Sequence, residues 1–294
     1  NQTGRHNAFY EIHQLKAIHV LSTAPFYAKK PDGNFAVERF ELYNTVISAL
    51  QWRRVNGEIY LATDSKGAEY VKNIGLYKIW NDVLPVIDDS GEGINQRMFW
   101  ASGKLLALRE IEGPVAIVDM DFIVWSKLNF GDRIICAHRE ELMPHVYPPK
   151  EHFIMKSYPY PQNLDWSVLP CNTAFCYFPD ESFKQYYVNQ SIAFMKSAVD
   201  CDDYLCYMVF AEQRLLAMLA NAVGVGIDTL LDKDKLFVPQ DGFTHLWGAK
   251  QKMRESIKLC EDFCQQCRVR IKTDFPDFAY TIDLIEQQAF EHKI

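Results

Sequence analysis

The sequence predicts an α/β protein in which helices cover both faces of a mostly parallel sheet. Two observations support this fold class. Short apolar runs rich in Val and Ile alternate with helix-like segments through the first 130 residues, and polar residues follow several of the runs. Crossovers of this kind place strands in parallel, and such sheets bind ligands outside the carboxyl ends of the strands. We therefore expect the functional residues at those strand ends.

The first 130 residues are predicted to alternate between strand and helix. Apolar runs predict strands at 15–23, 58–63, 77–86 and 115–124, and helical spacing of apolar residues predicts helices at 38–54, 68–74 and 94–110. Turn-forming residues predict a loop at 25–35. Five polar residues fall at strand ends and are expected to line the ligand site: Ser22, Thr23, Asp64, Asp119 and Asp121. Taken alone, Asp64 is equally a common turn former.

The second half of the chain is less regular. The predicted strands are 133–137, 171–178, 225–230 and 236–238, and the predicted helices are 181–199 and 204–223. A turn at 243–250 is expected to open a helix to about 267, followed by a terminal helix or tail at 274–290. Prolines and aromatic residues at 144–170 predict a long ordered loop that lines a substrate cleft. With no repeat or low-complexity linker, we expect one domain with a smaller C-terminal lobe.

Composition narrows the classes of function. The net charge is −7 and no long Lys/Arg run occurs, so nucleic acid is not an expected partner. No apolar stretch is long enough to span a bilayer, and the N-terminal residues lack an apolar signal core. The eight cysteines do not form a disulfide-like framework, which favours a reducing, cytoplasmic setting. Cys260, Cys264 and Cys267 share one helical face, where they either pack as small apolar residues or, alternatively, hold an iron–sulfur cluster.

The run Val115–Trp125 carries Asp119 and Asp121 in its middle. Carboxylates inside a buried strand are costly unless a partner compensates them, and alternate residues of a strand point the same way. Carboxylate oxygens bind Mg²⁺ and Mn²⁺, which bridge well to phosphates. The pair therefore predicts a metal site for a diphosphate substrate. The alternative is a strand that ends at Asp119, with both acids in a solvated turn.

Further motifs follow this pair in a fixed order. They are N-T-A-F-x-Y-F from Asn172, the acid–amide pair Glu212-Gln213 in a predicted helix, and H-x-x-G-x-K from His245 to Lys250. Over residues 15–255 this order resembles the GT-A nucleotide-sugar glycosyltransferases, and it is most similar to family 8, the retaining galactosyltransferase and glycogenin-like group. The resemblance implies a GT-A-like, Rossmann-like fold in a single domain at 1–294. Residues 15–130 would bind the nucleotide, 131–255 the donor sugar and acceptor, and 256–294 would form a helical tail.

The resemblance also implies roles for individual residues. Mn²⁺ or Mg²⁺ would be held by Asp119, Asp121 and His245. The diphosphate of a UDP-sugar donor would be contacted by Lys104, Gly248 and Lys250, and the donor sugar by Asn172, Glu212 and Gln213. The acceptor would be a saccharide or a lipid-linked saccharide. This sequence departs from the family in having Glu212 in place of the usual Asp and Gln251-Lys252 in place of Pro-Trp.

Each motif also has a purely structural interpretation. His245 beside Trp247 is typical of a buried histidine, Lys250 of a helix start, Asn172 of a strand start, and Glu212-Gln213 of a polar helix face. Other functions remain open as well. A haloacid-dehalogenase-like phosphatase, a nucleotidyltransferase, or a module that binds a sugar nucleotide without turnover could each use the Asp pair. No G-x-G-x-x-G follows the first strand and no P-loop occurs, which disfavours ordinary dinucleotide binding.

Overall fold

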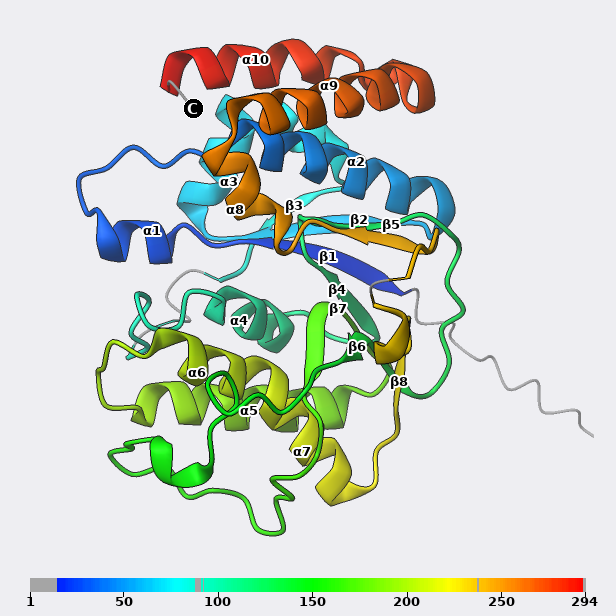
Figure 1. Ribbon diagram of the computed structural model, residues 1–294. Coiled ribbons are helices and arrows are strands. Elements are labelled where there is room, and N and C mark those ends of the chain that lie inside the picture. The colour runs from blue at the N-terminus through cyan, green and yellow to red at the C-terminus, as the bar shows by residue number, and fades with distance from the viewer. Residues whose placement is uncertain (1–14, 88–90, 92, 237, 293–294) are drawn as a thin grey trace, which may run out of the picture.

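A central sheet lies between two layers of helices in the computed structural model, which describes residues 15–87, 91, 93–236 and 238–292 (Figure 1). The main sheet has seven strands in the order β3-β2-β1-β4-β7-β6-β8, and a second sheet pairs β5 with β9. The strands are β1 (Lys16–Leu21), β2 (Ile59–Thr63), β3 (Val83–Pro85), β4 (Val115–Val118), β5 (Phe122–Val124), β6 (Ile134–Arg139), β7 (Cys171–Phe178), β8 (Ile227–Thr229) and β9 (Phe243–His245).

The main sheet is mostly parallel. Strands β3, β2, β1 and β4 run parallel to one another, and β8 is parallel to β6. Strand β7 runs antiparallel to both of its neighbours, β4 and β6. The α/β class with a mostly parallel sheet is therefore confirmed.

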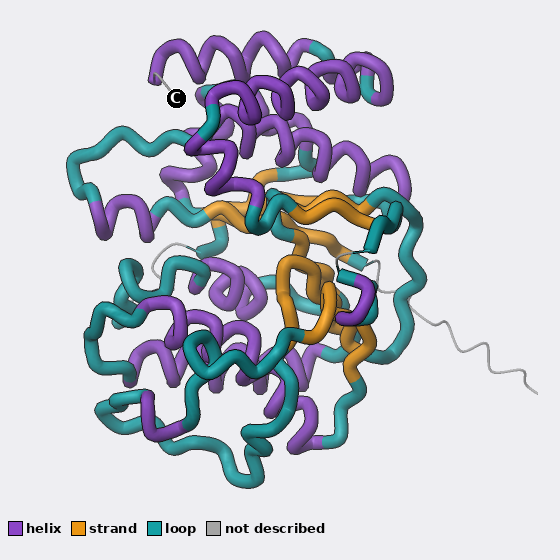
Figure 2. The backbone as a smooth tube through the Cα atoms, in the orientation of Figure 1, coloured by secondary structure: helices purple, strands orange, loops and turns teal. Residues whose placement is uncertain are grey.

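Helices cover both faces of this sheet, as predicted. In Figure 1, α2, α9 and α10 lie above it and α4, α5, α6 and α7 below it, and Figure 2 shows the strands as the layer between them. The helices are α1 (Ala24–Lys29), α2 (Arg39–Val55), α3 (Ser65–Asn73), α4 (Ser102–Glu110), α5 (Glu181–Ser197), α6 (Tyr204–Val209), α7 (Leu215–Val223), α8 (Ala249–Glu255), α9 (Ile257–Asp274) and α10 (Tyr280–His292).

The apolar core is divided in two by the sheet. On β1, Ala17 belongs to the cluster under α2 and α9, whereas the next residue, Ile18, belongs to the cluster under α4, α5 and α7. On β4, Ala116 and Ile117 alternate in the same way. This alternation follows from the two-residue repeat of a strand, and it explains why central strands are apolar throughout.

The two C-terminal helices are fastened to α2 by ion pairs. Arg39 of α2 pairs with Glu261 of α9 at 2.5 Å and with Glu286 of α10 at 3.2 Å, and the hydroxyl of Tyr43 donates to Glu286. On α9, Cys264 and Cys267 are buried against this layer. The predicted packing of these two cysteines as small apolar residues is confirmed, and both thiols are free.

Three predictions in the first half need correction. The predicted loop at 25–35 contains α1, which begins with Pro25 in its first turn. Helix α3 begins at Ser65 rather than 68, because the Asp64 carboxylate accepts from the N–H of Gly67 and caps the helix. The helix predicted at 94–110 begins only at Ser102, and turns precede it, with the N–H groups of Arg97 and Met98 donating to the side chain of Asn95.

Further corrections concern the segments around the two Asp residues and the late motif. The apolar run at 115–124 is two strands, β4 and β5, and both acids lie in the turn between them. The segment at 243–250 is not only a turn, because β9 pairs with β5 before α8 begins. At 236–238 no strand forms at Leu236 or Val238, and residue 237 lies outside the described residues. The single helix expected to run to about 267 is two helices, since α8 ends at Glu255 and α9, capped by Ser256, continues to Asp274.

Within the described ranges, every helix is too short or too polar to cross a bilayer.

Candidate active site

The turn at 119–121 lies at the carboxyl end of β4, and side chains of α2 form hydrogen bonds with its backbone. The buried side chains of Asn44 and Ser48 donate to the backbone carbonyls of Met120 and Phe122, at 2.9 and 2.5 Å. A buried carbonyl without a partner is costly, so these bonds fix the path of the turn. The turn, rather than the alternation of a strand, brings the two carboxylates to one side.

His245 reaches the turn because β9 pairs with β5. In this register His245 lies opposite Phe122, and the N–H of Leu246 donates to the carbonyl of Asp121 at 3.1 Å. One ligand atom each from Asp119, Asp121 and His245 lies within 4.8 Å of the others. We call these three residues the active-site cluster.

Two lysines neutralise part of the charge of this cluster. The ammonium of Lys104, from α4, lies 2.6 Å from Asp119 and 2.7 Å from Glu212. The ammonium of Lys250, from α8, lies 2.9 Å from Asp121 and 3.1 Å from Glu41. Both predicted lysines therefore lie at the site, each between two carboxylates.

Burial and charge set the protonation of the cluster. Burial raises the pKa of Asp119 to about 7, against the lowering effect of the Lys104 ammonium. Burial would also raise the pKa of Asp121, but the ammonium of Lys250 and then His245 keep it below its ordinary value. Burial lowers the pKa of His245 to about 4, so its imidazole is neutral at pH 7 with a lone pair available. Around the cluster, the two ammonium groups thus lie among four carboxylates, those of the two Asp residues, Glu212 and Glu41.

Glu212 lies in a π-helical turn, Phe210–Arg214, between α6 and α7. Its carboxylate accepts from the hydroxyl of Thr173 at 2.7 Å as well as from Lys104. The buried hydroxyl of Tyr187 donates to the backbone carbonyl of Glu212 at 2.6 Å, which satisfies one carbonyl of the widened turn. Such turns often mark functional sites within helices, and this one presents a buried acid to the active-site cluster.

Asn172 and Gln213 are each oriented by a neighbour. The amide of Asn172 donates to Glu140 at 2.7 Å, and the hydroxyl of Tyr147 donates to Gln213 at 2.6 Å. Both side chains line the same pocket as the active-site cluster. The acid–amide pair predicted from sequence is therefore at the site rather than on a solvated helix face.

A pocket of about 460 Å³ opens over these residues. Trp100 and Trp247 line it and remain 40% and 64% exposed. Among the described residues that line it, none comes from the loop at 144–170, so the prediction that this loop lines the cleft is wrong for this pocket. The loop lies behind the π-helical turn, where Arg214 donates to the carbonyls of Tyr147 and Pro148.

The remaining predicted residues lie at the edge of the site. Ser22 lines both this pocket and a neighbouring one of about 620 Å³, which Thr23 and Asp64 also line. Asp64 accepts from the N–H and hydroxyl of Thr23, at 2.6 and 2.9 Å, so it fixes the end of β1. Gly248 begins α8 with ordinary helical angles and open space where a Cβ would lie. Its backbone does not itself require glycine.

Several residues of the site were not predicted from the sequence. They are Asn44 and Ser48, which hold the turn, and Glu41, Glu140, Tyr147 and Thr173, which contact the predicted side chains. The sequence does contain an indication of the roles of Asn44 and Ser48. Asn44 and Ser48 are one helical turn apart in a helix that is buried along most of its length, where Thr45 and Gln51 are buried as well. Polar side chains on a buried helix face need hydrogen-bond partners.

Comparison with known proteins gives distant structural likenesses. No curated protein matches the sequence. Similar solved structures include mouse xyloside xylosyltransferase 1 in its apo form, with 10% identity, a TM-score of 0.40, and coverage of 74% of this chain and 84% of that one. The galactosyltransferase LgtC, in complex with donor and acceptor sugar analogues, has 11% identity, a TM-score of 0.37 and coverage of 73% and 72%. A nucleoside-diphosphate-sugar pyrophosphorylase from Vibrio cholerae RC9 has 9% identity, a TM-score of 0.41 and coverage of 85% and 99%.

At these TM-scores the structural likeness is remote, and it carries no conclusion about function. The sequence itself gives a firmer assignment. A family model described as a family of unknown function, DUF6734, matches residues 27–285, which is most of the chain. The protein therefore belongs to the DUF6734 family.

Proposed function

We propose that this protein is a metal-dependent glycosyltransferase that uses a nucleoside-diphosphate sugar, with a UDP-hexose as the donor. One observation carries the proposal. Ligand atoms of Asp119, Asp121 and His245, brought together from two distant segments, lie within 4.8 Å of one another at the carboxyl end of a central strand. The same pocket contains Lys104 and Glu212. The resemblance of the motif order to GT-A enzymes supports the same conclusion.

The active-site cluster fits a divalent cation such as Mn²⁺. Its donors are two carboxylates and a neutral imidazole, and carboxylate oxygens suit Mn²⁺. Asp119, Asp121 and Glu212 bring three acidic groups that face two ammonium groups, so a cation would balance the remaining charge. Asp119, Asp121 and His245 would hold the ion. When bound, it would supply positive charge to the diphosphate that leaves the sugar.

The two lysines are suited to the same leaving group. Breaking the bond between sugar and phosphate develops negative charge on the diphosphate, and fixed cations stabilise that charge where it appears. Lys104 and Lys250 are held by carboxylates on either side of the cluster, 2.6 and 2.9 Å from Asp119 and Asp121. Each ammonium has more than one hydrogen to donate, so it can keep a carboxylate partner and also contact a phosphate oxygen.

Glu212, Gln213 and Asn172 are suited to the donor sugar. Their polar groups line the pocket beside the cluster and are held in place by Thr173, Tyr147 and Glu140. A carboxylate or carboxamide near the anomeric carbon stabilises an oxocarbenium-like transition state or attacks it, and the latter leads to retention. We propose retention, with Glu212 or Gln213 at the anomeric carbon.

The acceptor that we propose is a saccharide, free or lipid-linked. Trp100 and Trp247 leave large exposed ring surfaces at the pocket, 40% and 64% exposed. Exposed aromatic surface at a concave site is typical of a binding surface, and an aromatic ring packs well on the apolar face of a pyranose. A lipid-linked acceptor would be met at the inner face of a membrane, in the cytoplasm.

Calorimetric titration with UDP tests the proposal directly. With Mn²⁺ present we expect micromolar binding, and with EDTA we expect none. Asp121→Asn should weaken UDP binding in Mn²⁺ about 100-fold or more, since loss of an outer-shell partner alone often costs roughly 10–100-fold in metal affinity. Asp132→Asn is the matched control, because Asp132 is an exposed acid away from the pocket.

The outcomes separate the parts of the proposal. If another nucleoside diphosphate binds with metal and UDP does not, the base of the donor is wrong. If no nucleoside diphosphate binds with any metal, the glycosyltransferase proposal fails, and hydrolysis of an aryl phosphate would then test the phosphatase alternative. Retention is tested by NMR of the sugar released from a hydrolysed donor, where the first-formed anomer keeps or inverts its configuration.

A further inference from the structure

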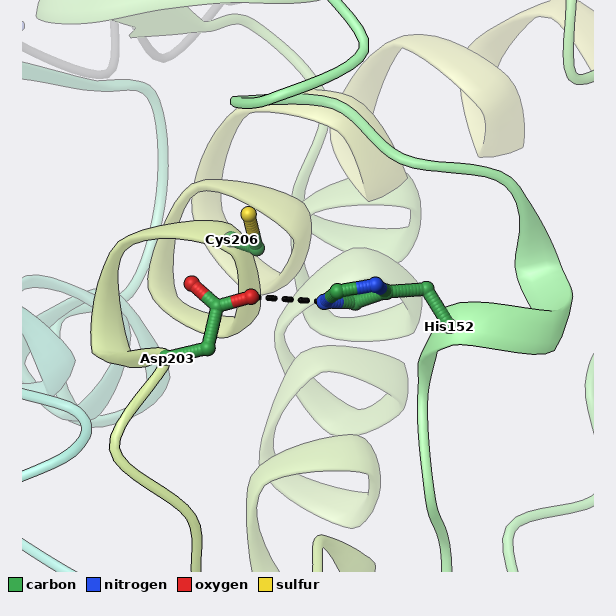
Figure 3. A group of neighbouring side chains, drawn as sticks. All are labelled: His152, Asp203 and Cys206. Carbon is green, nitrogen blue, oxygen red and sulfur yellow. Dashed lines mark hydrogen bonds and ion pairs between the residues drawn. The ribbon is translucent and has the colours of Figure 1, made fainter.

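A second group of potential metal ligands lies where the loop at 144–170 meets α6 (Figure 3). His152 ends a 3₁₀ turn of the loop, Lys150–His152, Asp203 directly precedes α6, and Cys206 is in its first turns. The Nε2 atom of His152 lies 2.6 Å from Oδ2 of Asp203, and one ligand atom from each residue lies within 4.8 Å of the others. We call these three residues the loop cluster.

The loop cluster is separate from the active-site cluster, although the same helix serves both. Leu205 and Met208 of α6 line the active-site pocket, whereas Cys206 points toward the loop and donates to the carbonyl of His145 at 3.3 Å. Neither His152 nor Cys206 is among the residues that line the described pockets. The donor site therefore does not account for this group.

The hydrogen-bond partners of the three side chains argue against a nucleophilic role for Cys206. A thiol nucleophile needs an imidazole beside the sulfur, to take its proton. Here His152 is hydrogen-bonded to Asp203, and the thiol donates to a backbone carbonyl instead. The group has the composition of a metal site rather than of a catalytic triad.

We propose that His152, Asp203 and Cys206 bind Zn²⁺, with a water molecule as the remaining ligand. Sulfur, imidazole nitrogen and carboxylate oxygen are the ligands that Zn²⁺ takes in proteins, usually in a tetrahedral arrangement. The side chains of His152 and Asp203 are 39% and 41% exposed, so an ion has a path from solvent, while Cys206 is buried and fixed by its helix.

Binding changes the protons in a defined way. The S–H bond of Cys206 breaks, a bond from sulfur to Zn²⁺ forms, and one proton leaves to solvent. Nε2 of His152, which donates its proton to Asp203 in the metal-free protein, gives up that proton and offers its lone pair to the ion, and the neutral ring then carries its single proton on Nδ1. Asp203 then exchanges its hydrogen bond with His152 for a bond to the ion.

Bound Zn²⁺ would fasten the loop to the helix that carries the acid–amide pair. The loop is already attached to α6 next to His152, because the N–H of Ile154 donates to the hydroxyl of Tyr207 at 2.7 Å. Earlier in the loop, the hydroxyl of Tyr147 donates to Gln213 of the π-helical turn. An ion at the loop cluster would add to the attachments between these two segments, and it would stabilise the folded state by mass action.

Cobalt substitution tests this site without reference to activity. A Co²⁺ ion bound to thiolate gives a charge-transfer absorption band in the near ultraviolet, which the active-site cluster cannot give because it holds no sulfur. We expect the band when Co²⁺ is added to the metal-free full-length protein, and we expect Zn²⁺ to displace it. Cys206→Ser should abolish the band, and His152→Ala should weaken Co²⁺ binding about 10-fold or more. Cys260→Ser, which removes a partly exposed thiol on α9, should leave the band intact.

Two results would overturn the proposal. One is that no thiolate band appears with Co²⁺ in the wild type. The other is that the band survives Cys206→Ser with its affinity unchanged. Far-ultraviolet circular dichroism checks that each variant is folded, and if Cys206→Ser is not, the loss of Co²⁺ affinity in His152→Ala decides the question. None of these outcomes depends on whether the protein binds UDP, so the zinc site and the glycosyltransferase function are tested independently.

Discussion

The active-site cluster and the loop cluster contain similar groups in different surroundings. Each brings an imidazole and at least one carboxylate within 4.8 Å. In the active-site cluster, His245 and both acids are largely buried, and the acids pair with lysines that are themselves shared with Glu212 and Glu41. In the loop cluster, His152 and Asp203 are more exposed and pair with one another.

This difference shows that residue type alone does not define a site. Buried charges that compensate one another form a network in which removal of one member leaves the others unbalanced. An exposed pair is screened by water and contributes little to stability. The active-site cluster should therefore be sensitive to single substitutions, and the loop cluster should tolerate them when no metal is bound. The predictions below test that contrast, in order of decreasing effect.

Lys104→Met should have the largest effect. It removes the ammonium that separates Asp119 from Glu212, and breaking a buried pair in this way typically costs about 3–5 kcal/mol of folding free energy. Urea denaturation in EDTA measures the loss. Added Mn²⁺ should restore part of it, because a cation again balances the carboxylates. Lys72→Met, at an exposed position of α3, is the control, and an equally small loss in both variants would contradict the network.

Glu212→Gln should lower the rate of donor hydrolysis about 100-fold, since positioned charge at a reacting centre typically contributes a factor of this size. The amide oxygen can still accept from Thr173 and Lys104, so the fold should be kept. Affinity for UDP with Mn²⁺ should change less than about 3-fold, because Glu212 is not a member of the active-site cluster. Glu69→Gln, at an exposed position of α3, is the control. A matched loss of UDP affinity would place Glu212 at the diphosphate instead of the sugar.

His152→Ala should have the smallest effect. In EDTA it removes only an exposed pair with Asp203, worth about 0–1 kcal/mol in urea denaturation. His145→Ala is a matched control in the same loop, because the carbonyl of His145 that accepts from Cys206 is retained. A loss of several kcal/mol in EDTA would show that the two clusters do not differ in the way described.

The sequence predicted the fold class well because strand and helix patterns are local. The strands β1 and β2, the start of β4 and the helix α2 were placed nearly as observed. The path after Val118 could not be predicted in the same way. It depends on Asn44 and Ser48 of α2 and on β9, which pairs with β5 from more than a hundred residues away. Local periodicity carries no information on such partners.

The candidate site was predicted in part, and for a different reason. The motif order suggested Asp119, Asp121 and His245 together, and the structure brings them together. The residues that orient Glu212 and Gln213 were not predicted, because Thr173 and Tyr147 have no distinguishing pattern until their partners are known. The loop cluster was missed because His152 and Cys206 lie far apart in sequence without a recognised ligand spacing.

The pairing of Arg39 with Glu261 and Glu286 joins residues 222 and 247 positions apart in the chain. During synthesis α2 therefore leaves the ribosome long before the helices that cover it. Phe40 and Tyr43 of α2 share a core cluster with residues of α9, so this apolar surface stays uncovered until α9 has emerged. The nascent chain thus passes through a stage in which its N-terminal strands can pair while the outer layer above them is incomplete. Assembly of that layer is therefore a late step in folding during synthesis.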